Sequence, residues 1–312
     1  MTSQPPGELI AWASSLVGPV RDAELISTSN SRVWAVRDAA GARYALKHLL
    51  DTSSMPRTEN LVRSALPADA PLCRLLGAQQ HPDGTAFLLS EHVAGPTLDQ
   101  RIDDASDDTS RAWARELVRL LDLVAAVPVT GFGKLPDGLE AGHPSWSAFL
   151  RDYLAEQRDK APGLASLRHA GLHALLDSAA GHLDAEVPVP RLVAADINNR
   201  NFVVTDRGPV CVNLPVLWAG DPLFAHGQAL LHRAGTAGAA WLADRYAGWR
   251  LHLSAAYHAY VVLAYVERFA GVPLEEATPW GRQTPLLELH DRHLELARAG
   301  LAAASAPTGG PR

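Results

Sequence analysis

The chain has 312 residues, a mass of 33.4 kDa and a formal net charge of −6 at pH 7. Hydrophobic residues make up 47% and charged residues 20% of it, a composition typical of globular proteins that excludes a disordered chain. The acidic balance argues against a nucleic-acid-binding protein, and two cysteines, Cys73 and Cys211, are too few for a disulfide framework.

The N-terminal segment, MTSQPPGELIAW, lacks a basic stretch followed by an apolar core, so we expect no signal peptide. The most apolar run, residues 257–265, is shorter than the roughly 18 residues that a membrane span needs. We therefore expect a cytoplasmic protein that does not associate with a membrane.

The first part of the chain has the pattern of a helix followed by a β-sheet. Leu9, Trp12 and Leu16 recur at helical spacing, which predicts a helix over residues 8–16. Short apolar runs separated by turn residues then predict strands. These strands are expected at residues 24–26, 33–36, 43–47 and 87–89, with a helix over residues 57–66 before the last of them.

From Thr97 onward the pattern becomes helical. Residues 112–127 contain Leu117, Leu120, Leu121 and Val124, which is the spacing of a buried helical stripe. Further helices are expected at residues 164–183, 223–232, 239–270 and 286–304. The expected fold class is therefore α+β, with a sheet lobe over residues 1–93, a helical lobe over residues 94–304 and a disordered tail over residues 305–312.

The stretch from Arg191 to Asp221 carries the chemistry. A short apolar run leads into Asp196, and Asn201 follows five residues later. A hairpin is then expected, with strands at residues 202–205 and 209–212. A carboxylate and an amide at this spacing suit phosphoryl transfer, because the carboxylate can accept a hydroxyl proton and the amide oxygen can bind Mg²⁺.

This stretch resembles the catalytic and metal-binding segments of the aminoglycoside phosphotransferases and choline kinases, which are relatives of the protein kinases. That group typically has His-Gly-Asp, an Asn five residues after the Asp, a hairpin, Ile-Asp-Trp-Glu, and Gly-Asp-Pro eight residues after the second Asp. Asp196, Asn201 and Asp221 match this pattern, and the Tyr-Ala-Leu-Lys that ends at Lys47 is similar to the Val-Ala-Ile-Lys strand of kinases. The resemblance implies a two-lobed protein kinase-like fold.

The resemblance also implies a role for each matching residue. Lys47 would contact the α- and β-phosphates of ATP, or of another nucleoside triphosphate, and Glu59 in the next helix would hold it in place. Asp196 would deprotonate the acceptor hydroxyl, while Asn201 and Asn213 would hold Mg²⁺. The rest of the nucleotide site would consist of the phosphate loop, with Ser29 and Asn30, and the adenine-binding linker, with Ser90, Glu91, His92 and Val93.

Two positions depart from the family pattern. Ala194-Ala195 stand where His-Gly is expected, and Asn213 stands where the principal metal-binding Asp is expected. An amide offers one neutral oxygen, which is a weaker ligand for a hard cation than a carboxylate. Three functions therefore remain open: an ATP-dependent phosphotransferase acting on a hydroxyl of an aminoglycoside-like or other natural-product-like molecule, a catalytically impaired pseudokinase-like binding protein, and a biosynthetic enzyme that uses Asp196 as a general base without ATP.

The acceptor is expected to be a small molecule, because nothing in the sequence resembles the activation segment of protein kinases. Five aspartates lie between Asp99 and Asp108, and they could attract a cationic acceptor. A solvated acidic helix cap or loop would explain the same residues.

Overall fold

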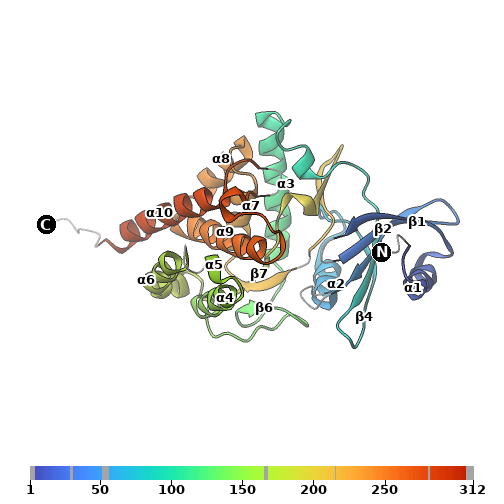
Figure 1. The fold of residues 1–312 in the computed structure, drawn as a ribbon, viewed down its shortest axis with the longest axis horizontal. Coiled ribbons are helices and arrows are strands. Elements are labelled where there is room, and N and C mark those ends of the chain that lie inside the picture. Colours follow the sequence, from blue (N-terminus) through green and yellow to red (C-terminus); the bar gives the residue numbers. More distant parts are fainter. Residues whose placement is uncertain are drawn as a thin grey trace.

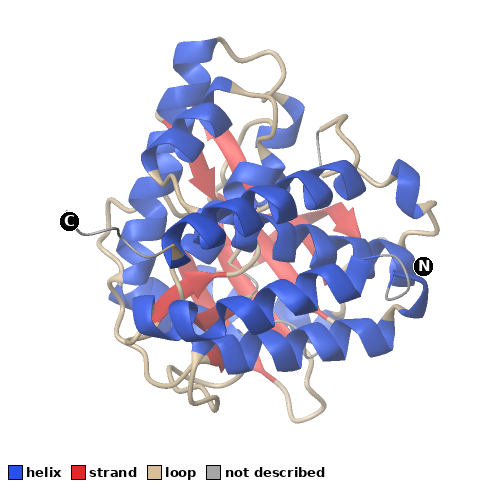
Figure 2. Ribbon diagram, turned by 90° about the vertical axis from the view of Figure 1, so that its left-hand side faces the viewer, coloured by secondary structure: helices blue, strands red, loops and turns tan. Residues whose placement is uncertain are grey.

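The computed structural model of the protein describes residues 4–28, 31–50, 56–164, 168–214, 216–279 and 282–306. It has two lobes, a small one built on a β-sheet and a larger, mainly helical one (Figure 1). Seen from the end of the larger lobe, the helices lie in front of the strands (Figure 2). The expected α+β class with a sheet lobe at the N-terminus is confirmed.

The small lobe contains a five-stranded antiparallel sheet in the order β1-β2-β3-β5-β4 within the described residues. The helix α1 covers one face of this sheet, where Leu9 of the helix is buried with Trp34 and Leu89 of the strands. The elements of the lobe are α1 (Gly7–Val17), β1 (Val20–Thr28), β2 (Ser31–Asp38), β3 (Arg43–Leu49), α2 (Pro56–Ala65), β4 (Leu75–Gln80) and β5 (Ala86–Glu91).

The strand β4 was not expected from the sequence. It contains Gly77 and ends in two glutamines, so it lacks the alternating apolar pattern of a strand. The glycine is required by packing: a Cβ at Gly77 would lie 2.5 Å from Leu16 Cδ1, on the α1 helix. The residue that weakens the strand signal is therefore the one that lets α1 approach the sheet.

The larger lobe contains a three-stranded sheet, β6-β10-β7, and the hairpin β8–β9, packed among helices in the described part of the chain. Its largest buried aromatic side chains include Trp146, Tyr257 and Tyr260. The elements of the lobe are η1 (Leu98–Gln100), α3 (Asp107–Ala125), β6 (Gly133–Lys134), α4 (Trp146–Lys160), α5 (Pro162–Leu164), α6 (Ala170–Glu186), β7 (Arg191–Ala194), η3 (Asn199–Asn201), β8 (Phe202–Thr205), β9 (Gly208–Cys211), β10 (Leu217–Gly220), α7 (Leu223–His232), α8 (Ala237–Arg245), α9 (Trp249–Phe269), η4 (Leu274–Glu276) and α10 (Leu286–Ser305).

The helix boundaries differ from the expected ones in three places, the first of which is α3, which begins at Asp107 instead of Ala112. The single helix expected over residues 239–270 is two helices, α8 and α9, separated by a segment that contains Gly248. Gly248 has a φ of 149°, which only glycine adopts readily, so the chain changes direction there. The helix expected to start at Leu164 starts at Ala170. Within the described ranges, no helix is long and apolar enough to cross a membrane.

The hairpin β8–β9 is bonded to segments on both sides of the lobe junction. Val204 N donates to Pro96 O at 2.9 Å, in the linker after β5. On the other strand, Cys211 N donates to Pro71 O and Cys73 N donates to Cys211 O, both at 2.8 Å. The hairpin expected from the sequence is therefore present, and it joins the two lobes.

Candidate active site

Asp196 lies just beyond the carboxyl end of the buried strand β7. Ala194 in this strand pairs with Leu217 of β10, and both are fully buried. The chain then leaves the sheet at Ala195, whose N–H donates to Val216 O at 2.9 Å. Ala194 and Ala195 are thus held by β10 and by the residue before it, and this fixes the backbone that leads to Asp196.

The helix α7 anchors the loop that carries Asp196. Ile197 is fully buried, and its N–H donates to Gln228 Oε1 at 3.0 Å. Asn199 is also fully buried, and its Nδ2 donates to His232 O at 2.7 Å. Gln228 was missed in the sequence, although a glutamine inside the apolar run of α7 is a recognisable signal for a buried polar contact.

A continuous chain of hydrogen bonds runs from the small lobe to Asp196. Lys47 Nζ donates to Asn213 Oδ1 at 2.8 Å, and Asn213 Nδ2 donates to Asn201 Oδ1 at 2.9 Å. Asn201 Nδ2 donates to Asp196 O at 2.9 Å and to Asp196 Oδ2 at 3.3 Å. Asn198 Nδ2 donates to Asp196 Oδ1 at 2.7 Å. Residues predicted from widely separated stretches of the sequence are therefore brought together.

The lysine fixes the direction of every bond in this chain. An ammonium group has donors and no acceptor, so Asn213 must turn its oxygen toward Lys47 and its NH₂ toward Asn201. Asn201 must then present its own oxygen to Asn213 and its NH₂ to Asp196. The Asp196 carboxylate is left as the terminal acceptor, which is the form that a general base requires.

Burial of the Asp196 carboxyl raises its pKa above the ordinary aspartate value. The hydrogen bonds from Asn198 and Asn201 and the positive charge of Lys47 act in the opposite direction. Asp196 is half-buried as a whole residue. A carboxylate with a raised pKa is a stronger base than an exposed aspartate.

The two residues expected to hold Mg²⁺ do not fit a protein-bound divalent cation. The Asn213 oxygen accepts from Lys47, and the Asn201 oxygen accepts from Asn213, so both candidate ligand atoms are already hydrogen-bonded. Both are neutral amides, whereas a protein site for Mg²⁺ usually supplies one or two carboxylates. No group of three or more His, Cys, Asp or Glu side chains in the described ranges is arranged to hold a metal.

Glu59 has other partners than the expected Lys47. It is buried in α2, and its Oε1 accepts from Arg63 Nη2 at 2.7 Å and from Arg63 Nε at 2.9 Å. The same oxygen accepts from Leu214 N at 3.3 Å. Arg63 lies one helical turn after Glu59, which places the pair on one face of the helix. Glu59 therefore supports Lys47 indirectly, by holding the backbone next to Asn213.

The residues expected to bind adenine lie at the end of β5 and in the linker after it. Ser90 is inside the sheet, opposite Ala45 of β3. The N–H groups of Glu91 and His92 donate to Arg74 O and Arg43 O, at 3.0 and 3.3 Å.

Val93 is therefore the first residue of the linker whose N–H is not used by another described residue. The two loop residues expected over the phosphates, Ser29 and Asn30, lie outside the described residues.

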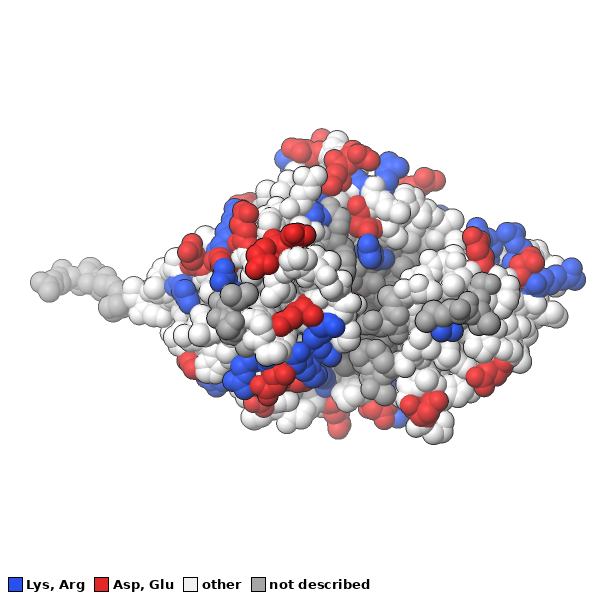
Figure 3. Space-filling model, viewed as in Figure 1, with Lys and Arg blue, Asp and Glu red and all other residues white. Residues whose placement is uncertain are grey.

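The acidic segment expected to attract a cationic acceptor is largely neutralised by arginines. Asp99 Oδ2 accepts from Arg200 Nε at 3.1 Å, and Asp103 pairs with Arg282. Asp107 and Asp108 lie in the first turn of α3 and both pair with Arg111. On the face drawn in Figure 3, acidic and basic side chains are likewise interspersed. The helix-cap interpretation of these aspartates is the better one.

Asp221 is not available to complete the site. Gly220 pairs with Arg191 at the start of β7, so Asp221 lies at the opposite end of the sheet from Asp196. It is 1% exposed, and it accepts from Arg250 Nη1 at 3.2 Å and from Leu223 N at 3.0 Å. Burial raises the pKa of Asp221, and Arg250 opposes this rise.

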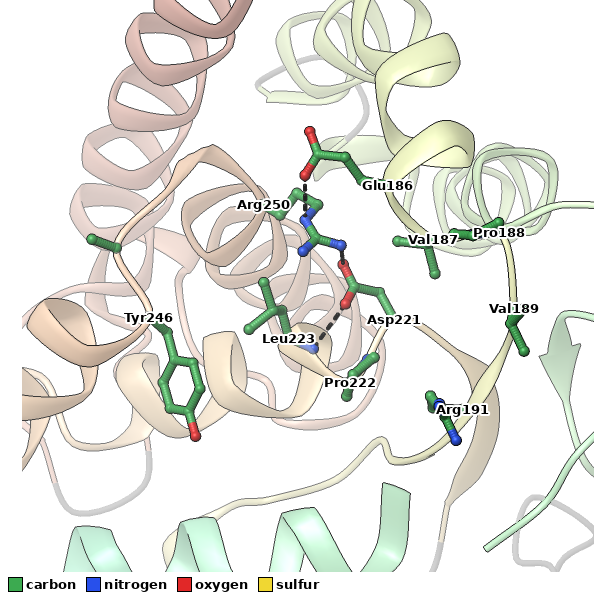
Figure 4. Close-up of a pocket in the computed structure, with 11 residues that line it drawn as sticks. Glu186, Val187, Pro188, Val189, Arg191, Asp221, Pro222, Leu223, Tyr246 and Arg250 are labelled. Atoms are coloured by element: carbon green, nitrogen blue, oxygen red, sulfur yellow. Dashed lines mark hydrogen bonds and ion pairs between the residues drawn. The ribbon is translucent and has the colours of Figure 1, made fainter. Parts of the chain in front are cut away.

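Asp221 lines a cavity of about 610 Å³ (Figure 4). Arg250 bridges Asp221 and Glu186 beside this cavity, with an Arg250 Nε to Glu186 Oε2 distance of 3.0 Å. Because it lies at the far end of β7 and β10, the cavity is separate from the residues around Asp196.

The sequence matches no protein-family model and is not significantly similar to any curated protein. Solved structures are similar in fold. A thermostable mutant of aminoglycoside phosphotransferase APH(4)-Ia aligns with a TM-score of 0.62 and 17% identity, covering 95% of this chain and 99% of that one.

Two further structures give the same result. A variant of the same enzyme in ternary complex with AMP-PNP and hygromycin B aligns with a TM-score of 0.66, 17% identity and the same coverage. The GDP and kanamycin complex of APH(2")-IIia aligns with a TM-score of 0.57 and 12% identity, over 95% and 99% of the two chains. The chain therefore has the two-lobed protein kinase-like fold of the aminoglycoside phosphotransferases.

Proposed function

We propose that the protein is an ATP-dependent phosphotransferase that acts on a hydroxyl group of a small molecule. The observation that carries this proposal is the hydrogen-bonded chain from Lys47 through Asn213 and Asn201 to Asp196. This chain supports a single site that contains the Lys47 ammonium group, which can bind phosphates, and Asp196, which can act as a general base. The structural neighbours act as further support, because they include complexes with AMP-PNP and hygromycin B and with GDP and kanamycin.

In the proposed reaction, Lys47 contacts the nucleotide phosphates and the N–H of Val93 pairs with the base. Asp196 accepts the hydrogen bond of the acceptor hydroxyl and orients it. The acceptor oxygen bonds to the γ-phosphorus while the bond to the β,γ-bridging oxygen breaks. The hydroxyl proton passes to Asp196, and ADP leaves. The role of the protein is to position the reactants and to offset charge on the transferred group.

Two alternatives are favoured by the amide at position 213. A binding protein without transfer activity would have no need for the carboxylate that kinases use there. An enzyme that uses Asp196 as a general base on another substrate would also keep the loop while losing the metal-binding residue. Either alternative keeps the carboxylate–amide loop and its support from α7.

The proposed function is tested by measuring whether the protein transfers phosphate from ATP to an acceptor. We expect ADP release from ATP in the presence of at least one member of a panel of hydroxylated small molecules, with transfer of the γ-phosphate detected by mass spectrometry. Asp196→Asn removes the base and should lower the rate by ~10²-fold or more. Asp206→Asn, an exposed residue in the turn between β8 and β9, is the matched control and should leave the rate unchanged.

Calorimetry separates the alternatives when no turnover is found. Binding of ATP without transfer to any acceptor would favour the impaired binding protein. The absence of ATP binding under all conditions would favour the general-base enzyme and would contradict the proposed function.

A further inference from the structure

The hydrogen bonds of Asn213 bear on how a nucleotide is bound, in an inference that rests on the proposed function. We propose that this protein binds the phosphates of a nucleoside triphosphate without a divalent cation, because the Asn213 amide group joins Lys47 directly to Asn201. The ligand class is the free, fully ionised nucleotide rather than its metal complex.

Within the chain from Lys47 to Asp196, every donor faces an acceptor. Asn213 donates one hydrogen bond to Asn201 and accepts one from Lys47, at 2.9 and 2.8 Å. Asn201 in turn donates to the backbone oxygen and to the carboxylate of Asp196. Each junction joins a donor to an acceptor, so no two oxygens face each other and no cation is needed between them.

An aspartate at position 213 would break this pattern. It could still accept from Lys47, but it would turn a second oxygen toward the oxygen of Asn201. If the Asn201 amide rotated to donate to that oxygen, its own oxygen would face the Asp196 carboxylate. Either arrangement leaves two acceptors in contact, which a divalent cation or a proton would resolve. The amide NH₂ of Asn213 removes the conflict without either.

The charge of the site leads to the same conclusion. A carboxylate at position 213 would repel the phosphates, and a neutral amide does not. The nearby carboxylate of Glu59 does not restore that repulsion, because it is paired with Arg63. Asp221 lies at the far end of the sheet from Asp196. The phosphates therefore approach Lys47 beside one carboxylate, Asp196, instead of two.

Calorimetry with ATP in excess EDTA and in excess Mg²⁺ tests the proposal. The wild-type protein should bind ATP under both conditions, with dissociation constants within about threefold of each other. Asn213→Asp should bind at least about tenfold more weakly in EDTA than in Mg²⁺. Asn60→Asp adds the same charge on the exposed side of α2 and should behave as the wild type.

The outcomes distinguish the two proposals. Wild-type binding that requires Mg²⁺ would overturn cation independence and leave the phosphotransferase proposal intact. The absence of ATP binding under both conditions would overturn both. If Asn213→Asp does not fold, the wild-type comparison between EDTA and Mg²⁺ still decides, and Asn201→Asp provides a second variant that creates the same conflict of oxygens.

Discussion

Lowering the pH from 6.5 to 5 should destabilise the protein through histidines buried in the helical lobe. His258 Nε2 lies 3.0 Å from His232 Nε2, and His252 Nδ1 lies 3.1 Å from His293 Nδ1. Each pair needs one donor and one acceptor nitrogen, so at least one ring of each must be neutral. Burial lowers the pKa of His258 to about 3 and that of His293 to about 4.

The sign and size follow from the difference in proton binding. Below pH 6.5 the unfolded chain protonates these rings while the folded protein keeps them neutral, so stability is lost as the pH falls. Each such histidine contributes about 1.4 kcal/mol per pH unit, or about 2 kcal/mol between pH 6.5 and 5. The raised pKa values of Asp196 and Asp221 act in the opposite direction and reduce the total slope.

Urea denaturation followed by circular dichroism at pH 7.5, 6.5, 5.75 and 5 measures this effect. His258→Gln keeps a polar group beside His232 but cannot be protonated, so the pH slope should fall by about 1.4 kcal/mol per unit. His182→Gln, an exposed histidine on α6, should retain the wild-type slope. Equal slopes for the wild type and His258→Gln would refute the reasoning.

Three further predictions follow from the described contacts. Gly220→Ala places a Cβ 2.1 Å from Trp146 and should cost about 3 kcal/mol of unfolding free energy in urea titrations, whereas Gly142→Ala, with nothing within 4 Å, should cost far less. Asp221→Ala removes the buried partner of Arg250, which keeps its ion pair with Glu186, and should cost about 2 kcal/mol in the same assay; a loss below about 0.5 kcal/mol would count against the ion pair. The rate of phosphate transfer should increase with pH through a pKa above the ordinary aspartate value, since Asp196 must be deprotonated to act; a rate independent of pH between 4 and 6 would contradict that role.

The sequence predicted the elements with strong local signals. The hairpin β8–β9 has two short apolar runs around a turn and was located correctly. The helix α3 was predicted from its buried stripe, although it begins at Asp107 instead of Ala112. The strand β4 was missed because its glycine serves a contact with α1, which is distant in the sequence. The break between α8 and α9 was missed because the apolar pattern continues across it.

The sequence pointed to the residues of the candidate site, but not to all of their hydrogen-bond partners. The residues singled out by the spacing of Asp196 and Asn201, and by the strand that ends at Lys47, lie in one hydrogen-bonded network. Their catalytic roles stay predictions. The partner of Glu59 could not be deduced, because Arg63 competes with Lys47 for the same carboxylate and only the packing of α2 decides between them. The neutralisation of Asp99 depends on Arg200, 101 residues later, which no local pattern reveals.

The hairpin β8–β9 limits how far the two lobes can move apart. One of its strands is bonded to Pro96, and the other to Pro71 and Cys73. Hinge bending about the linker would have to stretch or break these backbone bonds. The linker also lies close to the hairpin at Gly95, where a Cβ would be 2.4 Å from the Val204 carbonyl oxygen. Opening on the millisecond timescale should therefore be of small amplitude, and ligands should enter by side-chain and loop rearrangement rather than by separation of rigid bodies.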